Sequence, residues 1–177
     1  MFKDKKILVC GMARSGLSVA KLLKKMGAQV TVQDRKAEID WDGYNPTGIV
    51  QYLGRDPDDI VGEFELVIIS PGITVYAPFV QKAQELGIPV WGEAEFAYRL
   101  CPCPMVAITG TNGKTTVTTL VGEILRRHNA GTVVGGNIGI PLTELVATLS
   151  PDNIVVAEIS SFSLRPLRHL NRGFLRF

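Results

Sequence analysis

Four short runs of consecutive apolar residues set the fold class of this 177-residue chain. They lie at residues 7–10, 66–69, 105–108 and 154–157, and the first three are followed closely by glycine. A strand that is apolar at every residue has no face for solvent, which is typical of a parallel sheet covered by helices on both sides. The runs therefore predict an α/β fold.

Segments with helical spacing of apolar residues alternate with these strands. The segment 15–26 carries Leu17, Ala20 and Leu23 on one face and stops at Gly27. Further helices are predicted at 77–86 and 114–127, and further short strands at 30–34, 49–53, 90–91 and 133–134. This alternation indicates parallel sheets joined by helical crossovers.

The chain is predicted to hold two domains. Cys101-Pro102-Cys103-Pro104 contains two prolines, which block helix continuation and suit a linker. We therefore place a Rossmann-like parallel-sheet domain at residues 1–98 and a phosphate-loop α/β domain at residues 99–164. Residues 165–177 hold four arginines, no acid and no convincing periodicity. We expect this basic tail to fall outside the second domain, which then has too few strands and is incomplete.

The most specific signal is the string Gly110-Thr111-Asn112-Gly113-Lys114-Thr115-Thr116. A strand, a glycine-bearing turn and a helix N-terminus bring backbone N–H groups together around phosphates. Lys114 is suited to the terminal phosphates of ATP and the Thr115 hydroxyl to magnesium. Ile108 stands where the common eight-residue pattern has its first glycine, so a chance Gly-Lys-Thr is the alternative. The strand before the loop and the helix after it favour ATP binding.

An acid follows the last apolar run. Glu158 comes directly after residues 154–157, at the carboxyl end of the predicted strand. In phosphate-loop proteins this is where a second carboxylate directed at Mg²⁺ lies. A solvated acid at a strand end is the alternative, and the nearby phosphate loop makes the magnesium interpretation the better one.

A degraded dinucleotide fingerprint opens the chain, at residues 11–16. Ala13 replaces the middle glycine, which is the one that lets a pyrophosphate approach the backbone. Asp34 ends the second predicted strand, where an acid commonly meets a ribose or a base. The pattern therefore allows binding of some nucleotide but not clearly of a dinucleotide, and a tight turn with no ligand is a serious alternative.

The composition excludes several classes of protein. The chain is 46% hydrophobic and 20% charged, which is normal for a globular protein with a core. Without the arginines of the tail it is mildly acidic, so nucleic acid is not an expected partner. No apolar run is long enough to span a membrane, and the N-terminus is not a signal peptide. Cys101-Pro102-Cys103 lacks the spacing of redox and zinc motifs, so three reduced thiols in a cytoplasmic protein are expected.

Three strings, in order and spacing, resemble the Mur ligases: residues 108–116, the glycine-rich turn 135–139 and residues 158–162. The similarity extends back through residues 70–73 to 11–16 and covers roughly residues 5–164. It implies an ATP-dependent amide ligase of peptidoglycan precursor synthesis, in which ATP phosphorylates a carboxylate and an amine attacks the acyl-phosphate. Asn112 favours the branch that joins D-glutamate to UDP-MurNAc-L-alanine, with ATP and Mg²⁺ as cofactors and a monomeric chain.

The resemblance also implies roles for individual residues. Lys114 and Glu158 are the catalytic residues, residues 110–116 bind ATP, and Thr115 and Glu158 hold the metal. The UDP pocket of the first domain is lined by Arg14, Ser15, Asp34, Arg35, Ser70 and Gly72. Asn137 and Ser160 face the UDP-sugar, although composition alone allows the turn around Asn137 to be purely structural. A domain that holds UDP rather than NAD explains the missing middle glycine.

The chain departs from the family pattern at its end. Ser163 stands where the family usually has glutamine, and the downstream histidine, the carbamylated lysine and the C-terminal domain are not found. We therefore expect the chain to be inactive alone. The alternatives are a UDP-sugar or ATP-binding module without catalysis, the L-alanine-adding ligase, which usually carries histidine where Asn112 stands, and an NAD oxidoreductase, which Ala13 disfavours.

Overall fold

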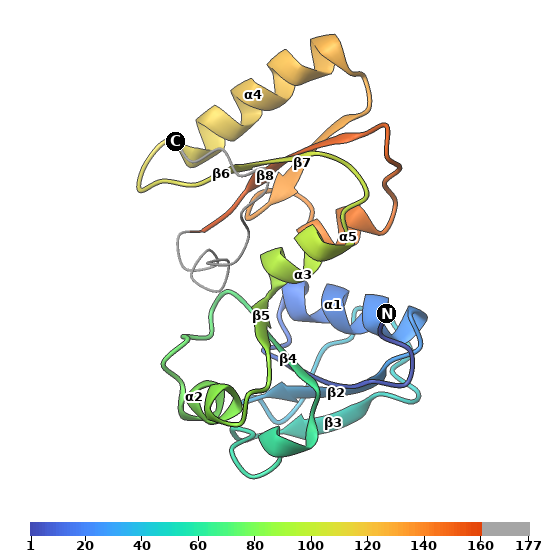
Figure 1. Ribbon diagram of the computed structural model, residues 1–177, viewed down its shortest axis with the longest axis vertical. Helices are drawn as coiled ribbons and strands as arrows, with labels where there is room; N and C mark the ends of the chain where they lie inside the picture. The colour runs from blue at the N-terminus through green and yellow to red at the C-terminus, as the bar shows by residue number, and fades with distance from the viewer. Residues whose placement is uncertain (161–177) are drawn as a thin grey trace. The chain divides into compact units, whose positions relative to one another are not determined.

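The computed structural model describes residues 1–160, which form two compact units, Met1–Glu93 and a second unit that begins at Ala94. Each unit contains a parallel sheet with helices packed on it (Figure 1). The predicted α/β class is thus confirmed. The predicted domain boundary at residues 98 and 99 falls inside helix α3 (Glu93–Leu100). The predictions for Ser163 and for the basic tail lie outside the described residues.

The first unit has a five-stranded sheet in the order β3-β2-β1-β4-β5. Its strands are β1 (Lys6–Cys10), β2 (Gln29–Asp34), β3 (Val50–Leu53), β4 (Leu66–Ile69) and β5 (Val90–Gly92), and every neighbouring pair is parallel. From β1 the chain first builds outward to β3 and then returns to place β4 on the other side of β1. The order of the strands therefore reverses between β1 and β4, and open α/β sheets bind ligands at such a point, beyond the carboxyl ends of the strands.

Helices α1 (Arg14–Lys25) and α2 (Pro78–Glu85) cover opposite faces of this sheet. Leu8 and Cys10 of β1 belong to one core cluster with Phe79 and Val80 of α2. Because side chains alternate along a strand, the neighbouring residues of β1 face the other side, where α1 contacts β1 and β2. Both faces are covered over β1, which explains why its residues 7–10 are all apolar and buried.

The second unit has the sheet order β6-β8-β7. Its strands are β6 (Met105–Ile108), β7 (Thr132–Gly136) and β8 (Ile154–Glu158), again all parallel. Helix α4 (Lys114–His128) packs on one face, while α3 and α5 (Leu142–Val146) share a core cluster with alternate residues of β6 and β8 on the other (Figure 1). Helices α3 and α5 were not predicted from the sequence.

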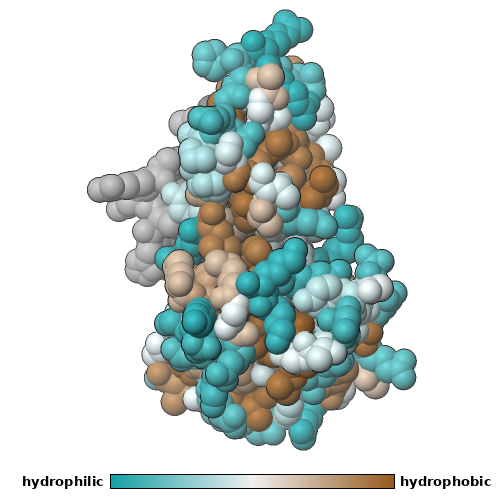
Figure 2. Space-filling model, turned by 90° about the vertical axis from the view of Figure 1, so that its right-hand side faces the viewer, coloured by the Kyte–Doolittle hydropathy of each residue, from teal (hydrophilic) through white to brown (hydrophobic). Residues whose placement is uncertain are grey.

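Some apolar side chains remain exposed on the described surface. On α4, Val117, Leu120 and Ile124 are 42%, 58% and 57% exposed, and their spacing places them on one side of the helix. Figure 2 shows one face of the molecule, where hydrophobic patches lie among hydrophilic ones. Within residues 1–160, the helices are all too short or too polar to cross a membrane.

Candidate functional site

The turn between β6 and α4 has the geometry of an anion site. Gly113 precedes the helix in the left-handed conformation, with φ 72°. Helix α4 has no side-chain hydrogen bond at its N-cap and no acidic residue in its first turn, and residues 111–113 are exposed. The first N–H groups of a helix have no partner within it and carry the positive end of the helix dipole. They are therefore available to phosphate oxygens.

Lys114 lies across this turn. Its Nζ donates hydrogen bonds to the carbonyl oxygens of Gly110, at 2.8 Å, and of Thr111, at 3.4 Å. These contacts hold the ammonium group at the N-terminus of α4. An ammonium group has three N–H donors, so one remains for a bound anion.

A hydrogen bond joins the turn to β8. The Thr115 hydroxyl donates to Oε2 of Glu158 at 2.7 Å, and the register of β6 and β8 places Glu158 beside Ile108, the last residue before the turn. Glu158 is only 5% exposed, and none of the ion pairs formed by the described residues includes it. A buried carboxylate that no cation balances is costly. The site is therefore one where a bound cation is favourable.

Thr115 and Glu158 suit magnesium. Mg²⁺ takes hard oxygen ligands at about 2.0–2.1 Å in octahedral geometry, so two adjacent ligand oxygens lie about 3 Å apart. The Thr115 and Glu158 oxygens, at 2.7 Å, are close to that spacing. Among the described residues there is no group of three His, Cys, Asp or Glu side chains that could hold a metal. Magnesium at phosphate sites commonly needs only one or two carboxylates, since phosphate and water supply the other oxygens.

The glycine-rich turn after β7 packs against the end of β8. Asn137 donates its backbone N–H to the Glu158 carbonyl oxygen at 2.9 Å. Gly136 has φ 110°, and a Cβ added to it would lie 2.3 Å from that same oxygen. Asn137 is exposed, and Ser160 is half-buried two residues beyond Glu158. The predicted residues Asn137 and Ser160 thus lie at the same carboxyl edge of the sheet as the phosphate loop.

Sequence reasoning did not single out Thr109, which stands between β6 and Gly110. Its hydroxyl oxygen is shielded from solvent and has no hydrogen-bond partner among residues 1–160. Its place directly before the first glycine of the loop was the available signal.

The first unit has a second strand-to-helix turn, between β1 and α1. Gly11 has φ 83°, and the Ser70 hydroxyl donates to its carbonyl oxygen at 2.5 Å. A Cβ on Gly16 would lie 1.9 Å from this same oxygen, so the first turn of α1 packs directly on the backbone of the preceding turn. Like α4, helix α1 has no side-chain cap and no acid in its first turn, where Arg14 and Ser15 lie. This turn is also suited to an anion.

The Asp34 side chain is hydrogen-bonded to the turn of the first unit. Its two carboxylate oxygens accept the backbone N–H groups of Met12, at 2.7 Å, and Lys36, at 3.0 Å. The side chain therefore ties the segment after β1 to the segment after β2. The sequence interpretation, in which Asp34 meets a ribose or base, did not include this bracing.

A cavity of about 290 Å³ lies at this edge of the first unit. It is lined by Gly11, Gln33, Asp34, Arg35, Asp56, Gly72, Ile73, Thr74, Ala77 and Phe79. Arg35 donates two hydrogen bonds to the Asp56 carboxylate, at 2.9 and 2.8 Å, which lower the pKa of Asp56. Three of the six residues predicted for a UDP pocket line the cavity. The other three, Arg14, Ser15 and Ser70, lie in and beside the adjoining turn.

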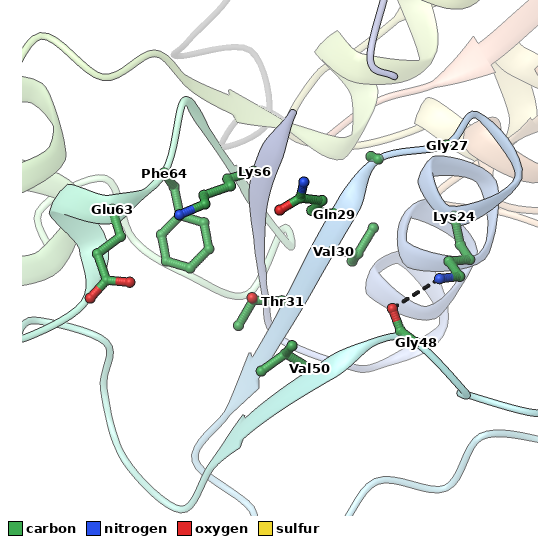
Figure 3. A pocket seen from close by; sticks show the side chains of 11 residues that line it. Lys6, Lys24, Gly27, Gln29, Val30, Thr31, Gly48, Val50, Glu63 and Phe64 are labelled. Carbon is green, nitrogen blue, oxygen red and sulfur yellow. Dashed lines mark hydrogen bonds between the residues drawn. The ribbon is translucent and has the colours of Figure 1, made fainter. Parts of the chain in front are cut away.

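A larger cavity, of about 590 Å³, lies at the opposite edge of the same sheet (Figure 3). Its lining includes Lys6, Gln29 and Val50, the first residues of β1, β2 and β3. Lys24 also lines it, but its Nζ donates to the Gly48 carbonyl oxygen at 2.9 Å. Ligands of open parallel sheets bind at the carboxyl ends of the strands. We therefore assign the candidate nucleotide site to the smaller cavity.

Two family models match the chain, one over each unit. The model of the MurD-like N-terminal domain of Mur ligases matches residues 5–92, and that of the Mur ligase middle domain matches residues 108–175. The chain belongs to the Mur ligase family. The middle-domain match also includes most of the segment 165–177, which the sequence analysis had set apart as a tail.

Two relatives of the chain carry the same name. The UDP-N-acetylmuramoylalanine–D-glutamate ligase of Enterococcus hirae is 46% identical over 92% of this chain, and that of Alkaliphilus metalliredigens is 41% identical over 96%. The chain spans 36% and 38% of the length of these two relatives.

Solved structures of Mur ligases show the same fold. A pseudomurein peptide ligase type C from Methanothermus fervidus matches with a TM-score of 0.51 and 27% identity, over 89% of this chain and 33% of that protein. A UDP-N-acetylmuramate:L-alanyl-gamma-D-glutamyl-meso-diaminopimelate ligase from Neisseria meningitides matches with a TM-score of 0.50 and 19% identity, over 90% of this chain and 55% of that protein. At this identity the second likeness concerns the fold alone.

Proposed function

We propose that this chain takes part in the ATP-dependent addition of D-glutamate to UDP-MurNAc-L-alanine, a step of peptidoglycan precursor synthesis. The names of relatives that are 41–46% identical support this reaction. The second unit binds Mg²⁺ and ATP, and the first unit binds the UDP moiety. The three free cysteines suit a reducing compartment, and we propose the cytoplasm.

The observation that carries the proposal is the bond between Thr115 and buried Glu158 at the N-terminus of α4. It places two hard oxygens, a lysine ammonium and free helical N–H groups on one strand-to-helix turn. These groups match the phosphates of a nucleotide and their magnesium ion.

The residues of the turn then stabilise the negative charge of the phosphates and form no covalent bond to the substrates. A magnesium ion bound there would neutralise phosphate charge during phosphoryl transfer to the substrate carboxylate. Lys114 holds the terminal phosphates with its ammonium group, the N-terminus of α4 binds phosphate oxygens through its N–H groups, and Thr115 and Glu158 would hold the metal. ADP leaves as the acyl-phosphate forms, and the amine of D-glutamate then attacks the acyl carbon and releases inorganic phosphate.

Calorimetric titration with ATP, in the presence and absence of Mg²⁺, tests the second unit. Lys114→Ala should weaken binding at least about tenfold, which corresponds to about 1.4 kcal/mol, because it removes a charge-assisted contact. Glu158→Gln should weaken binding with Mg²⁺ while leaving Mg²⁺-free binding nearly unchanged. Arg127→Ala is the matched control, since Arg127 is an exposed cation in the last turn of the same helix. Equal affinities for Lys114→Ala and Arg127→Ala would refute the ATP assignment.

Titration with UDP-MurNAc-L-alanine tests the first unit separately. Arg35→Ala should weaken binding, because Arg35 is a cation that lines the cavity at the carboxyl edge of the sheet. Lys24→Ala changes a cation of the opposite cavity and should leave the affinity unchanged. Loss of binding in Lys24→Ala alone would move the UDP site to the larger cavity. An assay of phosphate release with D-glutamate added then measures whether this chain sustains the ligation.

A further inference from the structure

Two cysteines lie close together where helix α3 gives way to strand β6. Cys101 and Cys103 flank Pro102, and their Sγ atoms are 3.6 Å apart. The Cys101 thiol also lies 3.3 Å from the Cys103 carbonyl oxygen as a hydrogen-bond donor. Both side chains are half-buried against the core cluster of the second unit, whereas the two flanking prolines, Pro102 and Pro104, are exposed. Both thiols are therefore partly accessible to solvent.

We propose that Cys101 and Cys103 form a redox-active dithiol that a low-molecular-weight disulfide converts into an intrachain disulfide. A disulfide has an S–S length of about 2.05 Å, so the two sulfur atoms must approach by only about 1.5 Å from their observed separation. Rotation about the Cα–Cβ bonds supplies a movement of this size. The modification is independent of the proposed ligase function.

The exchange proceeds in two balanced steps. The Cys101 thiolate attacks one sulfur of the small disulfide, forms a mixed disulfide and releases one small thiolate. The Cys103 sulfur then attacks the Cys101 sulfur, breaks the mixed disulfide and releases the second small thiolate, which takes up the Cys103 proton. The two cysteines are oxidised and one small disulfide is reduced to two thiols.

The order of the two steps follows from the surroundings of Cys103. Burial, with a further contribution from the hydrogen bond to Cys101, raises the pKa of the Cys103 thiol to about 12. Very little of this thiol is ionised at neutral pH, and the thiolate is the attacking species. The Cys103 sulfur lies 3.6 Å from the Cys101 sulfur, and this proximity suits Cys103 to the second, intramolecular step.

A metal site at the cysteine pair is a weaker interpretation. No third His, Cys, Asp or Glu completes a metal site with the pair within residues 1–160.

The third cysteine provides an internal control. Cys10 is fully buried in the core of the first unit, and burial raises its pKa. A reagent that reaches only exposed thiols should therefore leave Cys10 unmodified in the folded chain.

Peptide mapping of the folded 177-residue chain tests the proposal. The chain is incubated with oxidised glutathione, the reaction is stopped with acid, free thiols are alkylated under denaturing conditions, and the product is digested with trypsin. Cleavage after lysine and arginine places Cys101 and Cys103 in the peptide 100–114 and Cys10 in the peptide 7–14. We expect the peptide 100–114 to lose the mass of two hydrogens and to take up no alkylating reagent, while the peptide 7–14 is fully alkylated. Dithiothreitol should reverse the change.

Single substitutions separate the two steps. Cys101→Ser and Cys103→Ser each leave one thiol, so the peptide 100–114 should stop at one bound glutathione or remain alkylated, and should never lose two hydrogens. The wild-type map needs no variant to fold. Two glutathiones on the wild-type peptide, or full alkylation after an incubation that modifies a single-cysteine variant, would overturn the proposal. Disulfide formation only after unfolding in urea would overturn it as well.

Discussion

Replacing Gly136 by alanine perturbs the candidate ATP site through the backbone. Gly136 ends β7 beside Glu158, the last residue of β8. Its φ of 110° lies outside the conformations that an alanine adopts readily, and the added Cβ would lie 2.3 Å from the Glu158 carbonyl oxygen. That oxygen cannot move away freely, because it accepts the backbone N–H of Asn137 at 2.9 Å.

The expected loss of stability has two parts. The positive φ costs about 1–3 kcal/mol in a residue other than glycine. Overlap with a fixed backbone oxygen adds about 1–3 kcal/mol more, as in other overpacked sites. Gly139→Ala is the matched control: Gly139 lies in the same turn with φ 67°, but nothing lies within 4 Å of an added Cβ. That control carries only the conformational cost, about 1–2 kcal/mol.

Urea unfolding followed by far-UV circular dichroism measures the difference. At a urea m-value of about 1–3 kcal/mol/M, a further loss of about 2 kcal/mol lowers the midpoint by about 1 M in Gly136→Ala relative to Gly139→Ala. Both tryptophans, Trp41 and Trp91, lie in the first unit, so their fluorescence follows that unit separately. Equal midpoints in the two variants would refute the close approach of β7 to the end of β8.

Three further predictions concern other contacts. Gly16→Ala should destabilise the first unit by more than about 3 kcal/mol in tryptophan-monitored urea unfolding, since its Cβ would overlap a backbone oxygen at 1.9 Å; a loss below about 1 kcal/mol would contradict this. Thr115→Val and Glu158→Met should show a coupling of about 1.5–3 kcal/mol in a double-mutant cycle of unfolding, whereas additive effects would exclude the hydrogen bond. The hydrogen bonds from Arg35 lower the folded-state pKa of Asp56, so their stabilisation is present above the unfolded-state pKa of about 3.9 and is lost as the pH falls through the lower folded value. Asp56→Asn should therefore lower the urea midpoint more at pH 7 than at acid pH, and an equal loss at both would contradict the assignment.

The strands and the long helices could be predicted from the sequence because burial on two faces leaves a clear trace. Residues 66–69 and 105–108 are apolar throughout, and the predicted strands coincide with β4 and β6. Helix α5 has only five residues, which is too short for a helical period to appear. Helix α3 starts directly after β5 with no turn residue to separate them, and it was therefore missed.

The residues of the candidate site could be predicted from the sequence, but the contacts between them could not. Glu158 could be chosen from its place after a strand, but its bond to Thr115 depends on β6 and β8 being neighbours, although forty-five residues lie between Ile108 and Ile154. The requirement for glycine at Gly136 arises from the register of β7 against β8, which no local pattern encodes. These contacts depend on the pairing of strands that are distant in the sequence, whereas local patterns were enough to predict the strands and the long helices.

Both units have a strand-to-helix turn with an acidic residue beside it, but the two acidic side chains make different hydrogen bonds. Asp34 and Glu158 each end the strand beside the one that feeds the turn. Both oxygens of Asp34 accept backbone N–H groups, so its charge is already stabilised by the protein. Among the hydrogen bonds of the described residues, the Glu158 side chain accepts only the one from the Thr115 hydroxyl. Glu158 is nevertheless buried, at the carboxyl end of β8. The carboxylate of Glu158 therefore keeps an oxygen for the metal ion proposed in the second unit, whereas the carboxylate of Asp34 is already used by the backbone of the first unit.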